Sequence, residues 1–124
     1  MITLQDAIRI HEILIMEFGG GSGIRDLNAL KAAINRPYAT FEEKDLYKTP
    51  FEKSAAILES ILINHPFIDG NKRTGYTLMR LMLLSERLDI VATQKDKYEF
   101  VMQIAKGELK IEAITEWINE RIKS

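Results

Sequence analysis

The fold of this chain is organised around one stretch, His65-Pro66-Phe67-Ile68-Asp69-Gly70-Asn71-Lys72-Arg73, which runs into an apolar segment that reaches about Arg87. Leucine and methionine occur on nearly every side of that segment, which predicts a central helix surrounded by the other helices. The residue before a proline is kept out of the α region, so the preceding helix should end near Asn64. The quoted stretch is therefore expected to form a loop between two helices.

Outside this stretch, apolar residues at helical spacing predict further helices over residues 3–18, 26–35, 50–64, 96–105 and 111–122. The glycine run at 19–23 should end the first helix, and Pro37 the second. Residues 89–93 are expected to be a short extended or turn piece. The chain shows no internal repeat and no low-complexity linker, so one domain over residues 1–124 is predicted. Its fold class should be an all-α bundle of about six helices.

Composition narrows the possible functions. The 124 residues are 46% hydrophobic and 28% charged, as in one soluble globular domain. The absence of cysteine excludes disulfides, a thiol nucleophile and thiolate metal sites, and it fits a reducing compartment. Seventeen basic and 18 acidic residues leave no global positive charge, so direct nucleic-acid binding is not expected. Without an apolar run of about 18 residues or a signal-peptide pattern, we expect a cytoplasmic protein with no membrane partner.

The start of the central helix has the features of an anion site. Gly70 and Asn71 lie where free backbone N–H groups and the positive end of the helix dipole meet. Lys72 and Arg73 add positive charge to the same turn, and an arginine can bind phosphate oxygens through two nitrogens. Two cations in a first turn oppose the dipole and lower stability unless an anion compensates. This arrangement predicts a phosphate-bearing ligand.

Two more reactive groups stand directly before this turn. Asp69 is a hard oxygen ligand suited to a magnesium ion that bridges phosphates. His65 carries an imidazole, the side chain best suited to take a proton from a hydroxyl near neutral pH. A base, a metal ligand and a phosphate cradle together indicate phosphoryl or nucleotidyl transfer, a reaction catalysed mainly by positioning and charge stabilisation.

Each of these residues, taken alone, also has a purely structural interpretation. His65 could cap a helix, Asp69 could be an N-cap, and Lys72 and Arg73 could be solvated charges. The convergence of all four on one turn favours the functional interpretation, because the two cations there need compensation.

Other polar residues near the loop are interpreted separately. His11 falls on the inner side of the first helix and is expected to be a satisfied buried histidine. Thr77 lies one turn beyond Arg73 and should border the ligand. Arg80 lies two turns beyond and either borders the ligand or forms an ion pair. The glycine run at 19–23 follows a helix and lacks the GxGxxG pattern, so it is a poor dinucleotide loop.

The sequence HPFIDGNKR resembles the signature loop of the Fic/Doc family, whose broad pattern is HPFx(D/E)GN(G/K)R, at every position. The Phe18-Gly19-Gly20 turn, the aromatic and acidic segment 38–47 and the helical C-terminal part resemble the short death-on-curing (Doc) toxins over nearly the whole chain. The resemblance implies an all-α fold in which a hairpin flap docks a protein substrate beside the loop. Residues 37–49 would form that flap.

The resemblance also implies roles for the loop residues. His65 would be the general base that activates a target hydroxyl, and Phe67 would be a buried anchor. Asp69 would position magnesium and the attacking hydroxyl. The nucleotide phosphates would be held by Gly70, Asn71 and Arg73.

Two departures from the AMP-transferring Fic enzymes affect the implied reaction. Lys72 replaces a glycine, and Tyr76 replaces a second arginine. Doc-type proteins share the Asn-Lys-Arg form, which implies that ATP binds in reverse and presents its γ-phosphate to a threonine of elongation factor Tu. The leading hypothesis is thus a kinase toxin that uses ATP and magnesium, with AMP transfer and a non-catalytic binding module as alternatives. Because the inhibitory (S/T)xxxE(G/N) motif is absent, restraint by an antitoxin in trans is expected.

Overall fold

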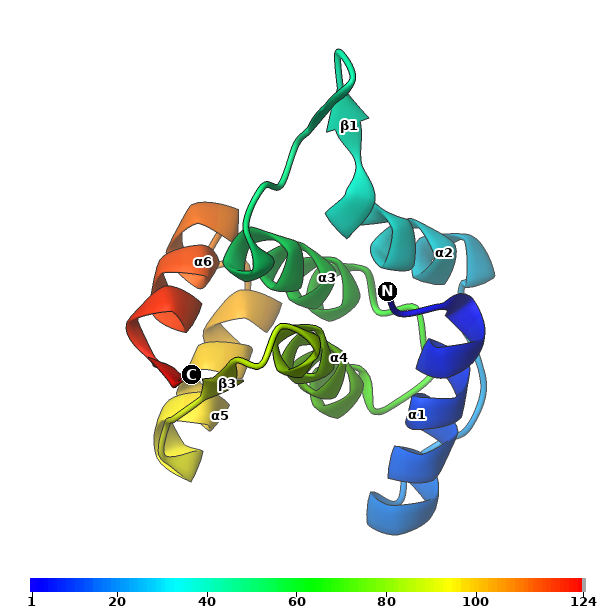
Figure 1. Ribbon diagram of the computed structural model, residues 1–124. Helices are drawn as coiled ribbons and strands as arrows, with labels where there is room; N and C mark the ends of the chain where they lie inside the picture. Colours follow the sequence, from blue (N-terminus) through cyan, green and yellow to red (C-terminus); the bar gives the residue numbers. More distant parts are fainter. Residues whose placement is uncertain (124) are drawn as a thin grey trace.

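The computed structural model describes residues 1–123, and within them the chain is mainly helical (Figure 1). The order of the helices along the chain is α1 (Leu4–Phe18), α2 (Leu27–Asn35), a 3-10 turn (Arg36–Tyr38), α3 (Pro50–Asn64), α4 (Asn71–Ser85), α5 (Gln94–Ala105) and α6 (Ile111–Glu120). The predicted all-α class is confirmed. In this part of the chain, no helix is both long and apolar enough to cross a membrane.

Short polar side chains set most of the helix starts. Thr3 forms a capping box with Asp6 at the start of α1, in which each side chain binds the backbone N–H of the other residue. Asp26, Thr49 and Thr93 cap α2, α3 and α5 in the simpler way, through a single side-chain acceptor. These caps explain why the predicted starts are correct to within a few residues.

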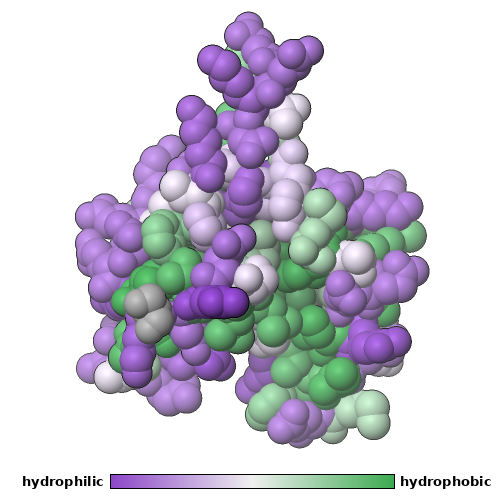
Figure 2. Space-filling model, in the orientation of Figure 1, coloured by the Kyte–Doolittle hydropathy of each residue, from purple (hydrophilic) through white to green (hydrophobic). Residues whose placement is uncertain are grey.

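Two short strand pairs complete the structure. β1 (Thr40–Phe41) pairs antiparallel with β2 (Lys44–Asp45) in a hairpin that projects from the helical body (Figure 1). This hairpin falls within the segment 37–49 that was predicted to form the flap. Figure 2 shows that mostly hydrophilic residues cover the hairpin, whereas apolar residues gather lower on the same face.

The second strand pair corrects the predicted end of the last helix. β3 (Asp89–Ile90) pairs antiparallel with β4 (Ile122–Lys123), and the N–H of Val91 donates to the carbonyl of Arg121. The final helix therefore ends at Glu120 instead of continuing to Ile122. The apolar spacing of Ile122 fits a helix, but backbone pairing with a strand more than 30 residues away in sequence decides its conformation.

The helix that lies at the centre of the bundle is α3, which packs against α2, α4, α5 and α6 (Figure 1). The prediction placed α4 there. However, Leu81 and Leu84 on α4 are 38% and 43% exposed, so one side of α4 faces solvent. Gly75 of α4 packs on Ile61 of α3, where an added Cβ would lie 3.3 Å from the Ile61 Cγ2 atom. The absence of a side chain there allows the two helices to approach closely.

The core divides into two clusters on either side of the α3–α4 pair. The N-terminal cluster consists of Ala7, Leu30, Ala33, Ile34, Ile57, Ile61, Phe67, Leu78 and Met82. The C-terminal cluster consists of Ala55, Leu58, Leu62, Met79, Leu83, Ile90, Phe100, Ile104, Ile114 and Ile118. The first cluster includes a residue of the loop between α3 and α4, whereas the second joins that helix pair to α5 and α6.

Candidate active site

The signature loop (residues 65–73) begins with an unusual backbone conformation. His65 is the C-cap of α3, with φ 47° and ψ 60° in the left-handed region. This region is disfavoured by about 1–2 kcal/mol for residues with a Cβ atom. The prediction that Pro66 excludes its predecessor from the right-handed α region is confirmed. The imidazole is exposed, so a group on another protein can reach it.

Phe67 anchors the loop in the N-terminal cluster. It is only 1% exposed, and its ring stacks on the His11 ring with 3.9 Å between centroids. The amide of Asn71 binds the Phe67 main chain on both sides, accepting from its N–H at 2.9 Å and donating to its carbonyl at 2.9 Å. The predicted anchor is confirmed. Because the Asn71 side chain is used in this way, only its backbone N–H faces the anion site.

His11 supports the loop from below. It is 2% exposed, and its Nε2 atom lies 2.8 Å from the main-chain oxygen of Asp69. The prediction of a satisfied buried histidine is therefore confirmed, and its partner is the signature loop itself.

The glycine-rich segment after α1 forms a second support that the sequence analysis missed. Ile68 donates its N–H to the carbonyl of Gly23, and Ile24 pairs with Phe67 in an antiparallel bridge. The N–H of Gly21 donates to Asp69 Oδ2 at 3.1 Å. Residues 21–26 thus run beside residues 66–69 as a backbone clasp. A run of glycines is a signal for close backbone approach, although it does not reveal the partner.

Asp69 is held as a carboxylate at the exposed edge of the loop. The N–H groups of Gly21 and Gly70, the latter at 2.8 Å from Oδ1, keep the pKa of Asp69 below its usual value. Each oxygen retains a second lone pair. In the described residues, no group of three metal-ligating side chains exists. A carboxylate with free lone pairs is the kind of oxygen ligand that a hard cation such as magnesium takes from a protein.

The N-terminus of α4 has the properties expected of an anion site. Gly70 is its N-cap, at φ 74°, and no side chain caps the helix. Lys72 and Arg73 are exposed, and neither takes part in a salt bridge between residues 1 and 123. The free N–H groups and both cations can therefore meet an incoming anion.

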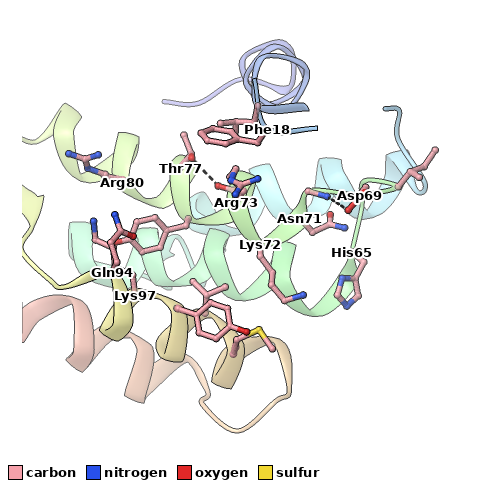
Figure 3. A pocket seen from close by; sticks show the side chains of 17 residues that line it. Phe18, His65, Asp69, Asn71, Lys72, Arg73, Thr77, Arg80, Gln94 and Lys97 are labelled. Atoms are coloured by element: carbon pink, nitrogen blue, oxygen red, sulfur yellow. Dashed lines mark hydrogen bonds between the residues drawn. The ribbon is translucent and has the colours of Figure 1, made fainter. Parts of the chain in front are cut away.

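Two further side chains contact Arg73. Its guanidinium carbon lies 4.0 Å from the centroid of the Phe18 ring, a cation–π contact at the end of α1. Its carbonyl accepts a hydrogen bond from Thr77 Oγ1 at 2.9 Å (Figure 3). Thr77 lines the pocket, and its predicted contact with a ligand stays a prediction. Phe18 also lines the pocket and was not predicted, because it belongs to a distant helix.

A pocket of about 900 Å³ is lined by the exposed residues of the signature loop together with Phe18 and Thr77. Figure 3 shows His65 and Asp69 at one end of it and Arg80 and Gln94 at the other, with Lys72 and Arg73 between them. The wall opposite α4 comes from α5, and the sequence analysis missed it. Its residues are Gln94, Lys97, Tyr98, Val101 and Met102.

Arg80 forms an ion pair with Asp89. Its Nε and Nη2 atoms donate to the two carboxylate oxygens of Asp89, both at 2.8 Å. The predicted ion pair is confirmed, and Arg80 also lines the pocket. The neighbouring Tyr76 is partly buried, which raises the pKa of its phenol to about 12, so it carries no charge at neutral pH.

The fold and the site together define an all-helical protein whose reactive groups surround one helix N-terminus. The sequence profile of the Fic/DOC family matches residues 1–83, and the chain belongs to this family. It is 46% identical over 59 residues to Toxin Doc of Mycolicibacterium smegmatis, covering 48% of this chain and 45% of that protein. It is 25% identical over 115 residues to Protein kinase doc of Escherichia phage P1, covering 93% and 90%. The chain thus spans less than half of the first relative and most of the second.

Proposed function

We propose that this chain is the toxin of a toxin–antitoxin pair and acts as a protein kinase. It transfers the γ-phosphate of ATP to a serine or threonine hydroxyl of a translation protein, with a threonine of elongation factor Tu as the leading candidate. The observation that carries this proposal is the N-terminus of α4, which no side chain caps. There Lys72 and Arg73 stand beside the ionised Asp69 and form no salt bridge within residues 1–123. The relative named Protein kinase doc supports the choice of reaction.

His65 acts as the general base in this reaction. Its imidazole accepts the proton of the target hydroxyl while the hydroxyl oxygen forms a bond to the γ-phosphorus. The bond between that phosphorus and the β–γ bridging oxygen breaks, and ADP leaves. The exposed position of His65 suits a hydroxyl that is presented by another protein.

The phosphates lie at the N-terminus of α4. The free N–H groups, Lys72 and Arg73 stabilise the negative charge that develops on the transferred group. Asp69 would hold a magnesium ion, which would supply positive charge to neutralise the phosphates. The N–H groups of Gly21 and Gly70 keep Asp69 ionised and oriented for this task.

Two residues favour phosphate transfer over AMP transfer. Lys72 occupies the place of the small glycine of AMP-transferring relatives and reduces the space for a phosphate there. Tyr76 occupies the place of their second arginine and is uncharged at neutral pH. Arg80 is a poor substitute for that arginine, because its Nε–Nη2 edge binds the carboxylate of Asp89, which balances its charge.

The protein substrate docks along the β1–β2 hairpin in this proposal. The hairpin is fixed at its base, where Arg36 donates to the Tyr47 hydroxyl at 2.9 Å and to Ser60 at 3.0 Å. At the end of β1, next to the turn of the hairpin, Phe41 is 69% exposed. A fixed base and one exposed aromatic side chain on an otherwise hydrophilic hairpin suit contact with a partner protein. An antitoxin supplied in trans restrains the enzyme.

The test uses elongation factor Tu and ATP labelled on either the α- or the γ-phosphate. We expect the factor to retain the γ label only, and the His65→Ala variant to transfer none. Retention of the α label would show AMP transfer instead. If His65→Ala remained as toxic as the unmodified chain, the protein would be a binding module that blocks its target without chemistry.

A further inference from the structure

One side chain grips the backbone of the candidate base from outside the signature loop. Arg25 lies in the clasp between α1 and α2, and its Nε atom donates to the His65 carbonyl at 2.6 Å. Its Nη2 atom donates to the carbonyl of Asn64. One edge of a single guanidinium therefore binds two consecutive main-chain oxygens at the end of α3.

These two carbonyls belong to the peptide planes before and after the Cα atom of His65. Each peptide unit is planar, so the rotation of the two planes about that atom is described by φ and ψ of His65 alone. The guanidinium is planar and holds its donors at a fixed spacing. By binding both oxygens, Arg25 fixes the two planes relative to each other and thus the direction in which the imidazole leaves the backbone.

The conformation that Arg25 holds is one that His65 would not favour by itself. With φ 47° and ψ 60°, this residue lies in the left-handed region, where a Cβ atom is crowded. The two carbonyls lie at the C-terminal end of α3, which lacks helical partners and carries the negative end of the helix dipole. A guanidinium at this position gives the two carbonyls hydrogen-bond partners, and its positive charge interacts favourably with the helix dipole.

Arg25 is itself held in place. Its backbone N–H donates to the Pro66 carbonyl at 2.8 Å, and the N–H of Asp26 donates to the same oxygen at 3.0 Å. The side chain of Asp26 caps α2 through the N–H of Ala29. The guanidinium therefore extends from a backbone that is anchored both to the loop and to the next helix.

We propose that Arg25 is a positioning residue that sets the backbone of His65 and hence the direction of its imidazole. Arg25 does not line the pocket. The catalytic consequence rests on the proposed transfer reaction, while the conformational consequence does not.

The conformational experiment needs no nucleotide. NMR of the full chain, labelled with ¹³C and ¹⁵N, compares the Cα and carbonyl shifts of Asn64 and His65 in the unmodified protein, Arg25→Ala and Arg25→Lys. We expect the left-handed signature of His65 to be lost in Arg25→Ala and only partly kept in Arg25→Lys, which retains charge without the planar fork. Added guanidinium ion at about 20 mM, far below the molar range of denaturation, should restore the signature in Arg25→Ala.

A matched control comes from the far side of the molecule. Arg121 also donates to a carbonyl within a helix, from its Nη1 atom to Trp117 of α6 at 3.3 Å, but it does not line the pocket. Arg121→Ala should leave the shifts of His65 unchanged. Unchanged shifts of His65 in Arg25→Ala as well would overturn the proposal.

The kinetic experiment measures phosphate transfer with the same variants. A misplaced base should lower kcat by about 10- to 100-fold, while KM for ATP changes by less than about threefold because the anion site is formed by α4. Guanidinium ion should raise kcat of Arg25→Ala and leave that of Arg121→Ala unchanged. A rise in KM at constant kcat, or no rescue, would overturn the positioning role.

The two experiments also separate this proposal from the proposed function. If the unmodified protein transfers no phosphate yet its His65 shifts depend on Arg25, the proposed reaction is wrong and the positioning role stands. If the protein transfers phosphate while Arg25→Ala behaves like Arg121→Ala in both experiments, the reaction stands and the positioning role is wrong.

Discussion

The two core clusters differ in the parts of the molecule that they pack together. The N-terminal cluster contains Phe67 of the signature loop, and all of its members lie in the segment 1–83 that matches the family. The C-terminal cluster joins α3 and α4 to α5 and α6, which lie beyond that match. The part of the chain that aligns the reactive groups is therefore the part shared with the family, while the opposite wall of the pocket is built by the remainder. Matched changes in the two clusters test this division.

The largest effect is expected from two buried phenylalanines. Phe67 and Phe100 are each 1% exposed, and each stacks on another ring, with centroids 3.9 Å apart for Phe67–His11 and 3.7 Å for Phe100–Trp117. Replacing either one by alanine should lower the free energy of unfolding by about 3–5 kcal/mol. Only Phe67→Ala should also abolish phosphate transfer, because only Phe67 anchors the signature loop.

Urea unfolding followed by circular dichroism measures the free energy of unfolding. Phosphate transfer per mole of folded protein measures the specific activity. The milder leucine variants serve if an alanine variant does not fold. An equal loss of specific activity in both variants would show that the C-terminal cluster also aligns the reactive groups.

A smaller effect is expected from two glycines with positive φ. Gly20 has φ +113° and Gly107 has φ +77°, so alanine should cost about 1–3 kcal/mol at either position. An added Cβ at Gly20 would lie 2.9 Å from Asp69 Oδ2, whereas at Gly107 its nearest neighbour would be Lys110 Nζ at 3.8 Å. Both variants should melt at lower temperature, but only Gly20→Ala should displace the carboxylate.

The corresponding measurement is transfer activity as a function of magnesium concentration. We expect Gly20→Ala to need more magnesium for half-maximal activity than Gly107→Ala does. Identical magnesium curves would contradict a role of Gly20 in the placement of the Asp69 carboxylate.

The smallest effect concerns the pH dependence of stability. Hydrogen bonds from Arg80 lower the pKa of Asp89 to about 2 from an ordinary value of 3.8. The stabilisation is therefore complete above pH 3.8 and is lost as the pH falls toward 2. Because the pair is partly exposed, Asp89→Asn should cost no more than about 1 kcal/mol at pH 7. The difference from the unmodified chain should vanish near pH 2.

Thermal unfolding between pH 2 and pH 7 measures this difference. The matched change near the signature loop is Asp69→Asn. The pKa of Asp69 is also lowered, in this case by hydrogen bonds from the N–H groups of Gly21 and Gly70. Asp69→Asn should reduce phosphate transfer, whereas Asp89→Asn should not. A loss of transfer in Asp89→Asn would show that the Arg80 pair contributes to the chemistry.

Much of the candidate site could be predicted because its groups are adjacent in sequence. His65, Asp69, Lys72 and Arg73 flank one helix start, and a helix start concentrates N–H groups whatever the rest of the fold does. The end of α3 was equally predictable, since Pro66 restricts the residue before it.

The supports of the site could not be predicted in the same way. Arg25 acts on a carbonyl 40 residues later, and the Gly21–Asp69 bond spans 48 residues. Neither contact leaves a periodic pattern in the sequence. Phe18 and the α5 wall likewise reach the pocket only because α1 and α5 pack near α4.

The amino-acid sequence by itself determined most of the helix bounds and the candidate anion site at the start of α4. These depend on caps, prolines and glycines that act within about four residues, the range of helical hydrogen bonds. Only the tertiary structure decided that α3 is the central helix, that Ile122 pairs in a strand and that Arg25 meets His65. Those outcomes depend on which backbone groups are brought together once both core clusters are packed, and no local preference specifies that choice.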